Sequence, residues 1–194
     1  DRGPRIDRVR RAFFSRAGRA EPAAADDASA LRLVSCGRPM PAHHVRIVDA
    51  AGQEGGERIE GRLEFRGPSA TAGYYRNPEQ TRRLFDGDWL DSGDRAYIAD
   101  GEVYLTGRVK DIIIRGGRNI YPHEVEDAVG AVPGARRGCS SAFGSLDPGS
   151  GTERFVVRAE TRVTGAAERN ALRARIVDTT VAVLGEPPDE VVLA

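Results

Sequence analysis

Lysine is nearly missing from this chain of 194 residues, and aromatic side chains are scarce. Lys110 is the only lysine, so every other basic side chain among the 29 is an arginine. Aromatic residues make up 6% and hydrophobic residues 40%, which predicts one or two cores that are mainly aliphatic. The 29 acidic side chains balance the basic ones. This zero net charge gives no electrostatic reason to expect nucleic-acid binding.

The chain also lacks the marks of zinc-binding, secreted and membrane-spanning proteins. Its two cysteines, Cys36 and Cys139, form no C-x-x-C pair, so we expect buried free thiols rather than a zinc site or a disulfide. No run approaches roughly 18 apolar residues and no signal peptide opens the sequence. We therefore expect a cytoplasmic protein with no transmembrane segment. Because the sequence does not begin with methionine, we expect it to be part of something longer.

Residues 1–30 are expected to form an N-terminal flank. The stretch "IDRVRRAFFSRAG" predicts a short helix with Val9, Phe13 and Phe14 on one side. The stretch "RAEPAAADDASA" that follows is made of small residues with one proline and has little to bury. It is expected to be a mobile linker.

Residues 31–107 have the pattern of a β-rich unit. The runs "LRLVSC", "HVRIVDA", "GRLEFRG", "RAYIA" and "EVYLTG" are punctuated by Gly, Pro or Asp, which predicts a small antiparallel, barrel-like sheet. Asp100-Gly101 suits a tight hairpin turn. One helix is expected at "NPEQTRRLF", with Asn77 as its N-cap and the apolar pair at its end facing inward.

Residues 108–194 predict a compact second unit. "DIIIR" is expected to be a strand, "GGRN" a turn, and "YPHEVEDAVGAV" a helix with Val125, Val129 and Val132 on one face. Two strands, "CSSAFGSL" and "ERFVVRAET", are joined by the expected turn "DPGSGT". An amphipathic helix over 166–184 and a last strand, "DEVVLA", complete a β-α-β-β-α-β order. The sequence therefore predicts an α+β fold with its boundary at 107/108.

Two residues of "WLDSGDRAYIADGEVYLTGR" have the chemistry of a sugar-binding site. Asp94 lies in a turn, and the two oxygens of its carboxylate match the two donors of a vicinal ribose diol. Arg108 ends the following hairpin and could meet a sugar or a phosphate. The alternative is an ordinary turn aspartate and a surface arginine, which the residues alone favour.

Three long stretches resemble the adenylate-forming superfamily, which includes acyl-CoA synthetases, acyl-AMP ligases, luciferases and adenylation domains of nonribosomal peptide synthetases. They are "GRLEFRGPSATAGYYRNPEQTRRLF", "WLDSGDRAYIADGEVYLTGR" and "GRVKDIIIRGGRNIYPHEVE", in the order and spacing of three superfamily motifs. The resemblance runs from about Gly37 to the end of the chain. Within it, "VSCGRPMPAHHVRIVD" and "DPGSGTERFVVRAET" look most like long-chain acyl-AMP ligases.

The resemblance implies a role for several residues. Asp94 matches the aspartate that holds both ribose hydroxyls of ATP and acyl-AMP, and Arg108 matches an arginine that contacts the nucleotide. Tyr97 matches an aromatic position near the nucleotide. Lys110 falls on the hinge about which the C-terminal lid domain of the family rotates. In the loop that lines the pantetheine tunnel, the matching residues are Gly116 and Gly117.

The implied reaction has two steps. A carboxylic acid, fatty or otherwise, attacks the α-phosphate of ATP with Mg²⁺ and forms acyl-AMP, after which a thiol attacks the acyl-AMP and releases AMP. The thiol would be the phosphopantetheine of an acyl carrier protein, the expected partner. Two alternatives stay open: an acyl-CoA synthetase that uses free CoA, and a non-catalytic module that docks a carrier protein.

The chain departs from the family pattern in two ways. It has no Ser/Thr/Gly-rich phosphate loop ending in lysine, and it stops at "EPPDEVVLA", before the segment in which the family carries its catalytic lysine. With Lys110 at the hinge, we expect no catalytic residue in this chain and no acyl-AMP formation by the 194 residues alone. His43, His44 and His123 are expected to be surface or cap residues rather than ligands, so no metal site is predicted.

Overall fold

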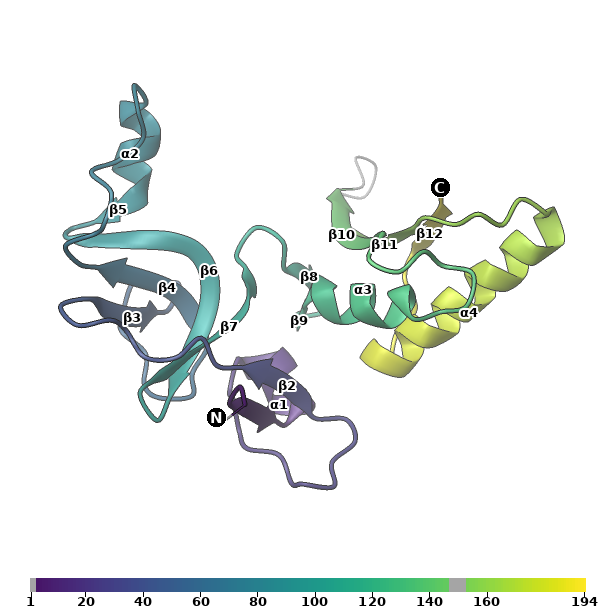
Figure 1. Ribbon diagram of the computed structural model, residues 1–194, viewed down its shortest axis with the longest axis horizontal. Helices are drawn as coiled ribbons and strands as arrows, with labels where there is room; N and C mark the ends of the chain where they lie inside the picture. The colour runs from purple at the N-terminus through teal and green to yellow at the C-terminus, as the bar shows by residue number, and fades with distance from the viewer. Residues whose placement is uncertain (1–2, 147–152) are drawn as a thin grey trace. The chain divides into compact units, whose positions relative to one another are not determined.

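The computed structural model describes residues 3–146 and 153–194, and it divides the chain into two compact units (Figure 1). Unit 1 is Asp1–Lys110 and unit 2 is Asp111–Ala194. This division follows Lys110, three residues beyond the position expected from the sequence. The expected "DPGSGT" turn, and the glycines within it, lie outside the described residues.

Unit 1 is built on a five-stranded antiparallel sheet in which β6 is the central and longest strand (Figure 1). β4 (Gly61–Arg66) pairs with one side of β6 (Trp89–Ala99), and β3 (His44–Val48) pairs with β4. The other side of β6 carries β5 (Phe85–Asp86) and then β7 (Glu102–Arg108). Among the described strands β3 and β7 do not pair with each other, so the small antiparallel sheet is confirmed but does not close into a barrel.

The turn between β6 and β7 is formed by the predicted Asp-Gly pair. Asp100 and Gly101 have φ angles of 53° and 73°. Two consecutive positive φ angles are the signature of the type I′ turn, whose twist suits a two-residue hairpin. This turn sets the register of β6 on β7 from Ala99–Glu102 as far as Ala96–Leu105. A β-bulge between Arg95 and Ala96 then shifts the pairing by one residue, so that Asp94 faces Arg108.

The N-terminal flank folds onto unit 1 through a strand that was not predicted. β1 (Ile6–Val9) pairs with β2 (Leu31–Val34), and the helix α1 is restricted to Arg11–Ala17. Val9 is fully buried in the strand, whereas Phe13 is 39% exposed and only Phe14 is buried within the helix. The prediction of one helix with all three side chains on the same side was therefore wrong, because Val9 pairs with Leu31 across a β-ladder.

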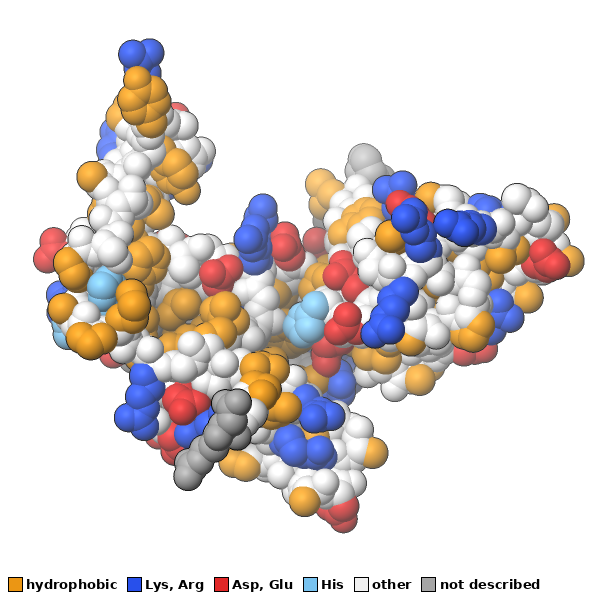
Figure 2. Space-filling view, viewed as in Figure 1, with side chains coloured by type: hydrophobic (Ala, Val, Ile, Leu, Met, Phe, Trp, Pro, Cys, Tyr) orange, Lys and Arg blue, Asp and Glu red, His pale blue; other side chains and the backbone are white. Residues whose placement is uncertain are grey.

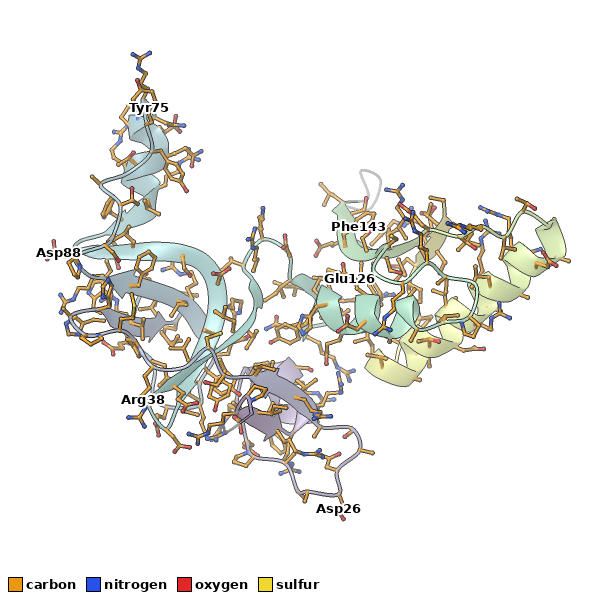
Figure 3. All side chains as sticks on the ribbon, in the orientation of Figure 1. Asp26, Arg38, Tyr75, Asp88, Glu126 and Phe143 are labelled. Atoms are coloured by element: carbon orange, nitrogen blue, oxygen red, sulfur yellow. The ribbon has the colours of Figure 1, made fainter. Side chains whose placement is uncertain are left out.

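Helix α2 (Pro78–Leu84) begins as the sequence predicts. The Oδ1 atom of Asn77 accepts a hydrogen bond of 3.0 Å from the Gln80 N–H, and Pro78 is the first helical residue. Leu84 and Phe85 are only half-buried, and the helix has no buried residue. The α2 segment stands out from the sheet of its unit, and the exposed side chain of Tyr75 lies near its tip (Figure 3).

Unit 2 has the predicted β-α-β-β-α-β order with one additional strand. β8 (Ile113–Arg115) pairs with β9 (Arg118–Ile120), which occupies part of the segment expected to be a turn. α3 (Pro122–Gly130) follows, and β10 (Ser140–Leu146), β11 (Glu153–Ala159) and β12 (Glu190–Leu193) form a second sheet. α4 (Ala166–Leu184) connects β11 to β12, which run parallel.

The core of unit 2 is aliphatic, as the composition predicts. Val125, Val129 and Val132 of the α3 segment are buried, and they pack in one cluster with Leu172 and Ile176 of α4. Phe155 is the one aromatic residue in this cluster. Charged side chains of both signs are interspersed on the visible face of each unit (Figure 2), in agreement with the zero net charge.

Candidate functional site

Asp94 and Arg108 meet across the β6–β7 hairpin of unit 1. They are paired residues in the antiparallel register, and the Nε atom of Arg108 lies 3.9 Å from Oδ1 of Asp94. The Asp94 side chain is 31% exposed and that of Arg108 is 64% exposed. A carboxylate and a guanidinium stand together at a surface where a ligand could reach both.

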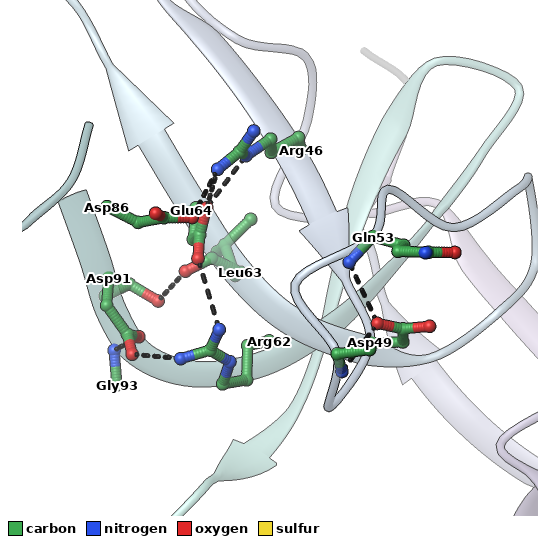
Figure 4. A network of polar contacts seen from close by, with 11 residues as sticks. Arg46, Asp49, Gln53, Arg62, Leu63, Glu64, Asp86, Asp91 and Gly93 are labelled. Carbon is green, nitrogen blue, oxygen red and sulfur yellow. Dashed lines mark hydrogen bonds and ion pairs between the residues drawn. The ribbon is translucent and has the colours of Figure 1, made fainter. Parts of the chain in front are cut away.

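Side chains help to hold the bend before Asp94. Gly93 has a φ of 76°, and its N–H donates to Oδ1 of Asp91 at 2.8 Å. The N–H of Asp94 donates to Oγ of Ser92 at 3.0 Å, and this hydroxyl donates to the carbonyl of Leu63 at 2.8 Å. Figure 4 shows the contact between Asp91 and Gly93. The direction of the Asp94 carboxylate thus depends on a small set of hydrogen bonds.

Tyr97 lies in the core of unit 1. Its side chain is 0% exposed, stacks on Tyr104 at 5.0 Å between ring centroids, and donates a hydrogen bond of 2.8 Å to Oδ2 of Asp7. Burial raises the pKa of this phenol well above its ordinary value, and the bond to Asp7 raises the pKa further. Tyr97 has no exposed surface for a nucleotide to contact in unit 1, so its surroundings give it a packing role.

Lys110 is the last residue of unit 1. Its side chain is exposed in the turn after β7, and the division between the two units comes directly after it. This place at a boundary is compatible with a hinge, and the hinge role of Lys110 stays a prediction.

Gly116 and Gly117 form the turn between β8 and β9. Their φ angles are 55° and 74°, in the left-handed region that favours glycine. A Cβ atom added at either residue would meet no heavy atom within 4 Å. The backbone conformation, rather than close approach to another part of unit 2, is therefore what requires glycine here, and the lining of a pantetheine tunnel stays a prediction.

The cysteines and histidines carry no catalytic arrangement. Cys36 is exposed and Cys139 partly buried, both as free thiols, so the prediction that Cys36 is buried was wrong. Cys36 follows the end of β2. Its backbone N–H donates a hydrogen bond to the carbonyl oxygen of Val103, while its side chain is exposed to solvent. His43 bonds through its ring to Ser69 and to the Pro41 carbonyl. Within residues 3–146 and 153–194, no group of three or more His, Cys, Asp or Glu side chains could hold a metal ion.

Sequence reasoning missed a charged cluster next to the candidate site. Glu64 in β4 is 0% exposed, and its carboxylate contacts Arg46 at 2.6 Å and Arg62 at 3.5 Å (Figure 4). Arg62 also contacts Asp91 at 3.1 Å. The alternation of charged and apolar residues in "GRLEFRG" signals a strand with one polar face, but nothing in that pattern shows that this face is covered.

Comparison with known proteins places the chain among adenylate-forming enzymes. No protein-family model matches it. A Caulobacter vibrioides protein with the provisional name acyl-CoA synthetase is 40% identical over 140 residues, which are 71% of this chain and 24% of that protein. The long-chain-fatty-acid–AMP ligase FadD26 of Mycobacterium tuberculosis is 33% identical over 179 residues, 85% of this chain and 30% of that ligase.

Solved structures agree with these relatives. One from a study of fatty acyl-adenylate ligases of E. coli and L. pneumophila matches with a TM-score of 0.86 and 28% identity, over 99% of this chain and 34% of the other. The structure of McyG A-PCP complexed with phenylalanyl-adenylate matches with a TM-score of 0.75 and 30% identity, over 84% of this chain and 29% of the other. The chain thus spans about a quarter to a third of the length of these four proteins.

These matches show which family the chain belongs to and which part of the family's proteins it corresponds to. The chain is related to ligases that form or use acyl-adenylates, which confirms the resemblance stated from its motifs. It corresponds to the C-terminal portion of the adenylate-forming superfamily, with acyl-CoA synthetases and fatty-acid–AMP ligases among its relatives. No helix in the described part of the chain is long and apolar enough to span a membrane.

Proposed function

We propose that this chain belongs to an ATP-dependent ligase that activates a carboxylic acid as acyl-AMP and passes the acyl group to a phosphopantetheine thiol. The observation that carries this proposal is the pair of Asp94 and Arg108, whose side chains lie 3.9 Å apart at the surface of unit 1. Both occupy positions that match nucleotide-contacting residues of the superfamily. Relatives named as a fatty-acid–AMP ligase and an acyl-CoA synthetase support the substrate class.

In the proposed mechanism, Asp94 orients the nucleotide. Its two carboxylate oxygens accept one hydrogen bond from each of the two ribose hydroxyls, while Arg108 donates to the same part of the nucleotide. This fixes the α-phosphate relative to the incoming carboxylate, and positioning of this kind supplies much of the rate enhancement of bimolecular reactions. Tyr97 supports the hairpin from the core side and is not assigned a contact.

Neither of the two chemical steps requires a covalent bond between the substrate and a residue of this chain. An oxygen of the substrate carboxylate attacks the α-phosphorus of ATP, and pyrophosphate leaves. The sulfur of a thiolate then attacks the acyl carbonyl carbon, and AMP leaves. Since no described cluster of side chains could hold a metal ion, we assign none of these residues to the Mg²⁺ that accompanies ATP.

Two candidate functions differ in the thiol that accepts the acyl group. A carrier protein is favoured because the match to fatty acyl-adenylate ligases covers nearly the whole chain, and a further match is to McyG A-PCP. Free CoA is the second candidate, because the 40% identical relative carries the name acyl-CoA synthetase. We propose a cytoplasmic location, in line with two free thiols among the described residues.

The test uses the longer protein that contains this chain, beside the 194 residues alone. The longer protein is expected to release pyrophosphate with ATP and a fatty acid, and to load holo carrier protein faster than free CoA. Faster transfer to CoA would favour the second candidate. The 194 residues alone are expected to release none. Failure of the longer protein to adenylate any carboxylic acid would contradict the proposal and favour a non-catalytic docking module.

A further inference from the structure

The backbone around Asp94 leaves the sheet at a defined place. β4 and β6 are in register at Arg62 and Arg95, and again at Glu64 and Asp91. One residue separates the two partners on β4, whereas three residues, Ser92 to Asp94, separate them on β6. These three residues therefore have no partner in the β4 ladder and form a bulge. On the β7 side, Asp94 pairs with Arg108 and the Gly93 carbonyl accepts a hydrogen bond of 3.0 Å from the Val109 N–H. On the β4 side, side chains have to fix their conformation.

Asp91, the residue before the bulge, helps to fix the bulge through two hydrogen bonds. One of its carboxylate oxygens accepts the Gly93 N–H at 2.8 Å, and the other accepts a hydrogen bond from Arg62 at 3.1 Å. Gly93 has a φ of 76°, in the left-handed region, and the hydrogen bond to Asp91 helps to hold this backbone conformation. Asp91 thus joins the backbone immediately before Asp94 to the side chain of Arg62 (Figure 4).

Arg62 is in turn tied to a buried charge. Its guanidinium lies 3.5 Å from Oε1 of Glu64, and the other oxygen of Glu64 lies 2.6 Å from Arg46. The Glu64 carboxylate is 0% exposed, so it cannot exchange these partners for water without disrupting the sheet. A buried charge with two cationic partners is therefore a rigid anchor for Arg62.

We propose that Glu64, Arg62 and Asp91 are positioning residues that hold the bulge so that the Asp94 carboxylate faces the ribose of a bound nucleotide. The inference rests on the proposed function, since it takes the ligand of Asp94 to be a ribose diol. It adds three residues that do not touch the ligand. Their effect is transmitted through the Gly93 N–H and the backbone of Asp94.

The test measures the preference of the 194-residue chain for AMP over 2′,3′-dideoxy-AMP. Both probes are titrated at millimolar concentration into ¹⁵N-labelled protein, with amide shifts of the turn as the signal. The diol should favour AMP by about tenfold or more in the unchanged chain, because two charge-assisted hydrogen bonds depend on it. Asp91→Ala and Arg62→Gln are expected to bring this ratio close to one. Asp91→Asn keeps an acceptor for Gly93 and should retain most of the preference.

The matched control is Asp86→Ala, which removes a 2.9 Å contact to Arg46 without touching the bulge. It should leave the ratio unchanged. The ratio separates positioning from stability, because partial unfolding lowers the affinity for both probes alike. In an Asp94→Ala background, Asp91→Ala is expected to have no further effect on either affinity.

The outcomes distinguish this inference from the function on which it rests. A chain with no preference for AMP, and no change with Asp94→Ala, would overturn both. If Asp94→Ala removes the preference while folded Asp91→Ala and Arg62→Gln keep it, only the positioning role is overturned. Should Asp91→Ala fail to fold, Arg62→Gln decides the matter, because the Arg62 side chain is 36% exposed and tolerates a polar replacement.

Discussion

Tyr97 illustrates how burial decides what a single side chain can do. The residue lies three positions after Asp94 in the same strand, yet its hydroxyl is committed to Asp7 and its ring to Tyr104. Phe14 packs on it edge-on at 5.9 Å between ring centroids. These contacts join the N-terminal flank to the central strand of unit 1, so the flank contributes to the stability of the sheet.

The raised pKa of Tyr97 predicts how unit 1 responds to alkaline pH. A phenol in the unfolded chain loses its proton near pH 10, while burial keeps the folded one protonated at higher pH. The stability it contributes is therefore full below about pH 10 and falls above it. Tyr97→Phe should therefore make the decline in thermal stability with rising pH smaller, as measured by the unfolding temperature between about pH 8 and pH 11.

Tyr75→Phe is the control for that measurement, because Tyr75 is 85% exposed. It should leave the pH dependence as it is in the unchanged chain. Since burial also raises the pKa of Tyr104, the decline with Tyr97→Phe should be smaller but not absent. An identical decline with and without Tyr97 would contradict the assignment.

Gly117 carries a second prediction for a single residue. Its φ of 74° costs an alanine about 1–2 kcal/mol, so Gly117→Ala should destabilise the β8–β9 hairpin by about this amount. Gly130→Ala is the matched control in the same unit, because Gly130 is not in the left-handed region and an added Cβ would come no closer than 3.6 Å to a neighbour. Hydrogen exchange at the amides of Ile113 and Ile120 reports the difference. Equal exchange in the two variants would refute the conformational argument.

At the scale of single elements, α2 depends on its cap more than on packing. It has no buried residue, so the bond from the Gln80 N–H to Asn77 is a large part of what holds its first turn. Asn77→Ala should weaken the helix by about 1 kcal/mol, which is roughly a fivefold faster amide exchange at Gln80 and Thr81. Asn77→Asp keeps the cap and should exchange like the unchanged chain. No change in Asn77→Ala would show that the cap is dispensable.

The elements that the sequence predicts well have local causes. The Asp100-Gly101 turn, the Asn77 cap and the valine spacing of α3 each depend on residues within a few positions of one another. The same turn brings Asp94 and Arg108 to one end of the hairpin, but a β-bulge between Arg95 and Ala96 makes them direct partners. The sequence therefore indicates that the two residues lie near each other, but it does not predict the bulge that pairs them directly.

The parts that the sequence does not predict have distant partners. β1 pairs with β2 across a gap of more than twenty residues, and Asp7 bonds to Tyr97 at a separation of 90. Glu64 looks like an ordinary polar residue on one face of a strand, but it is buried and its carboxylate contacts Arg46 and Arg62. Burial of that kind depends on which strands become neighbours, and no local pattern encodes it.

At the scale of the whole molecule, Lys110 stands where one compact unit ends and the next begins. If the chain bends there between the two steps of the reaction, a residue with fixed φ should impair the step that needs the second arrangement. Lys110→Pro in the longer protein is expected to slow thioester formation more than adenylation. Lys110→Ala removes the charge but keeps backbone freedom, and should affect both steps little. An equal loss of both steps in Lys110→Pro would count against the hinge.

The most direct test of the central claim is the ATP–pyrophosphate exchange rate of the longer protein with Asp94→Ala. Loss of two charge-assisted hydrogen bonds to the ribose, each contributing about 1.5–3 kcal/mol, should lower the rate by more than tenfold. Asp88→Ala, in the exposed turn just before β6 (Figure 3), should leave it unchanged. An exchange rate with Asp94→Ala equal to that of the unchanged protein would contradict the assignment of this site to the nucleotide.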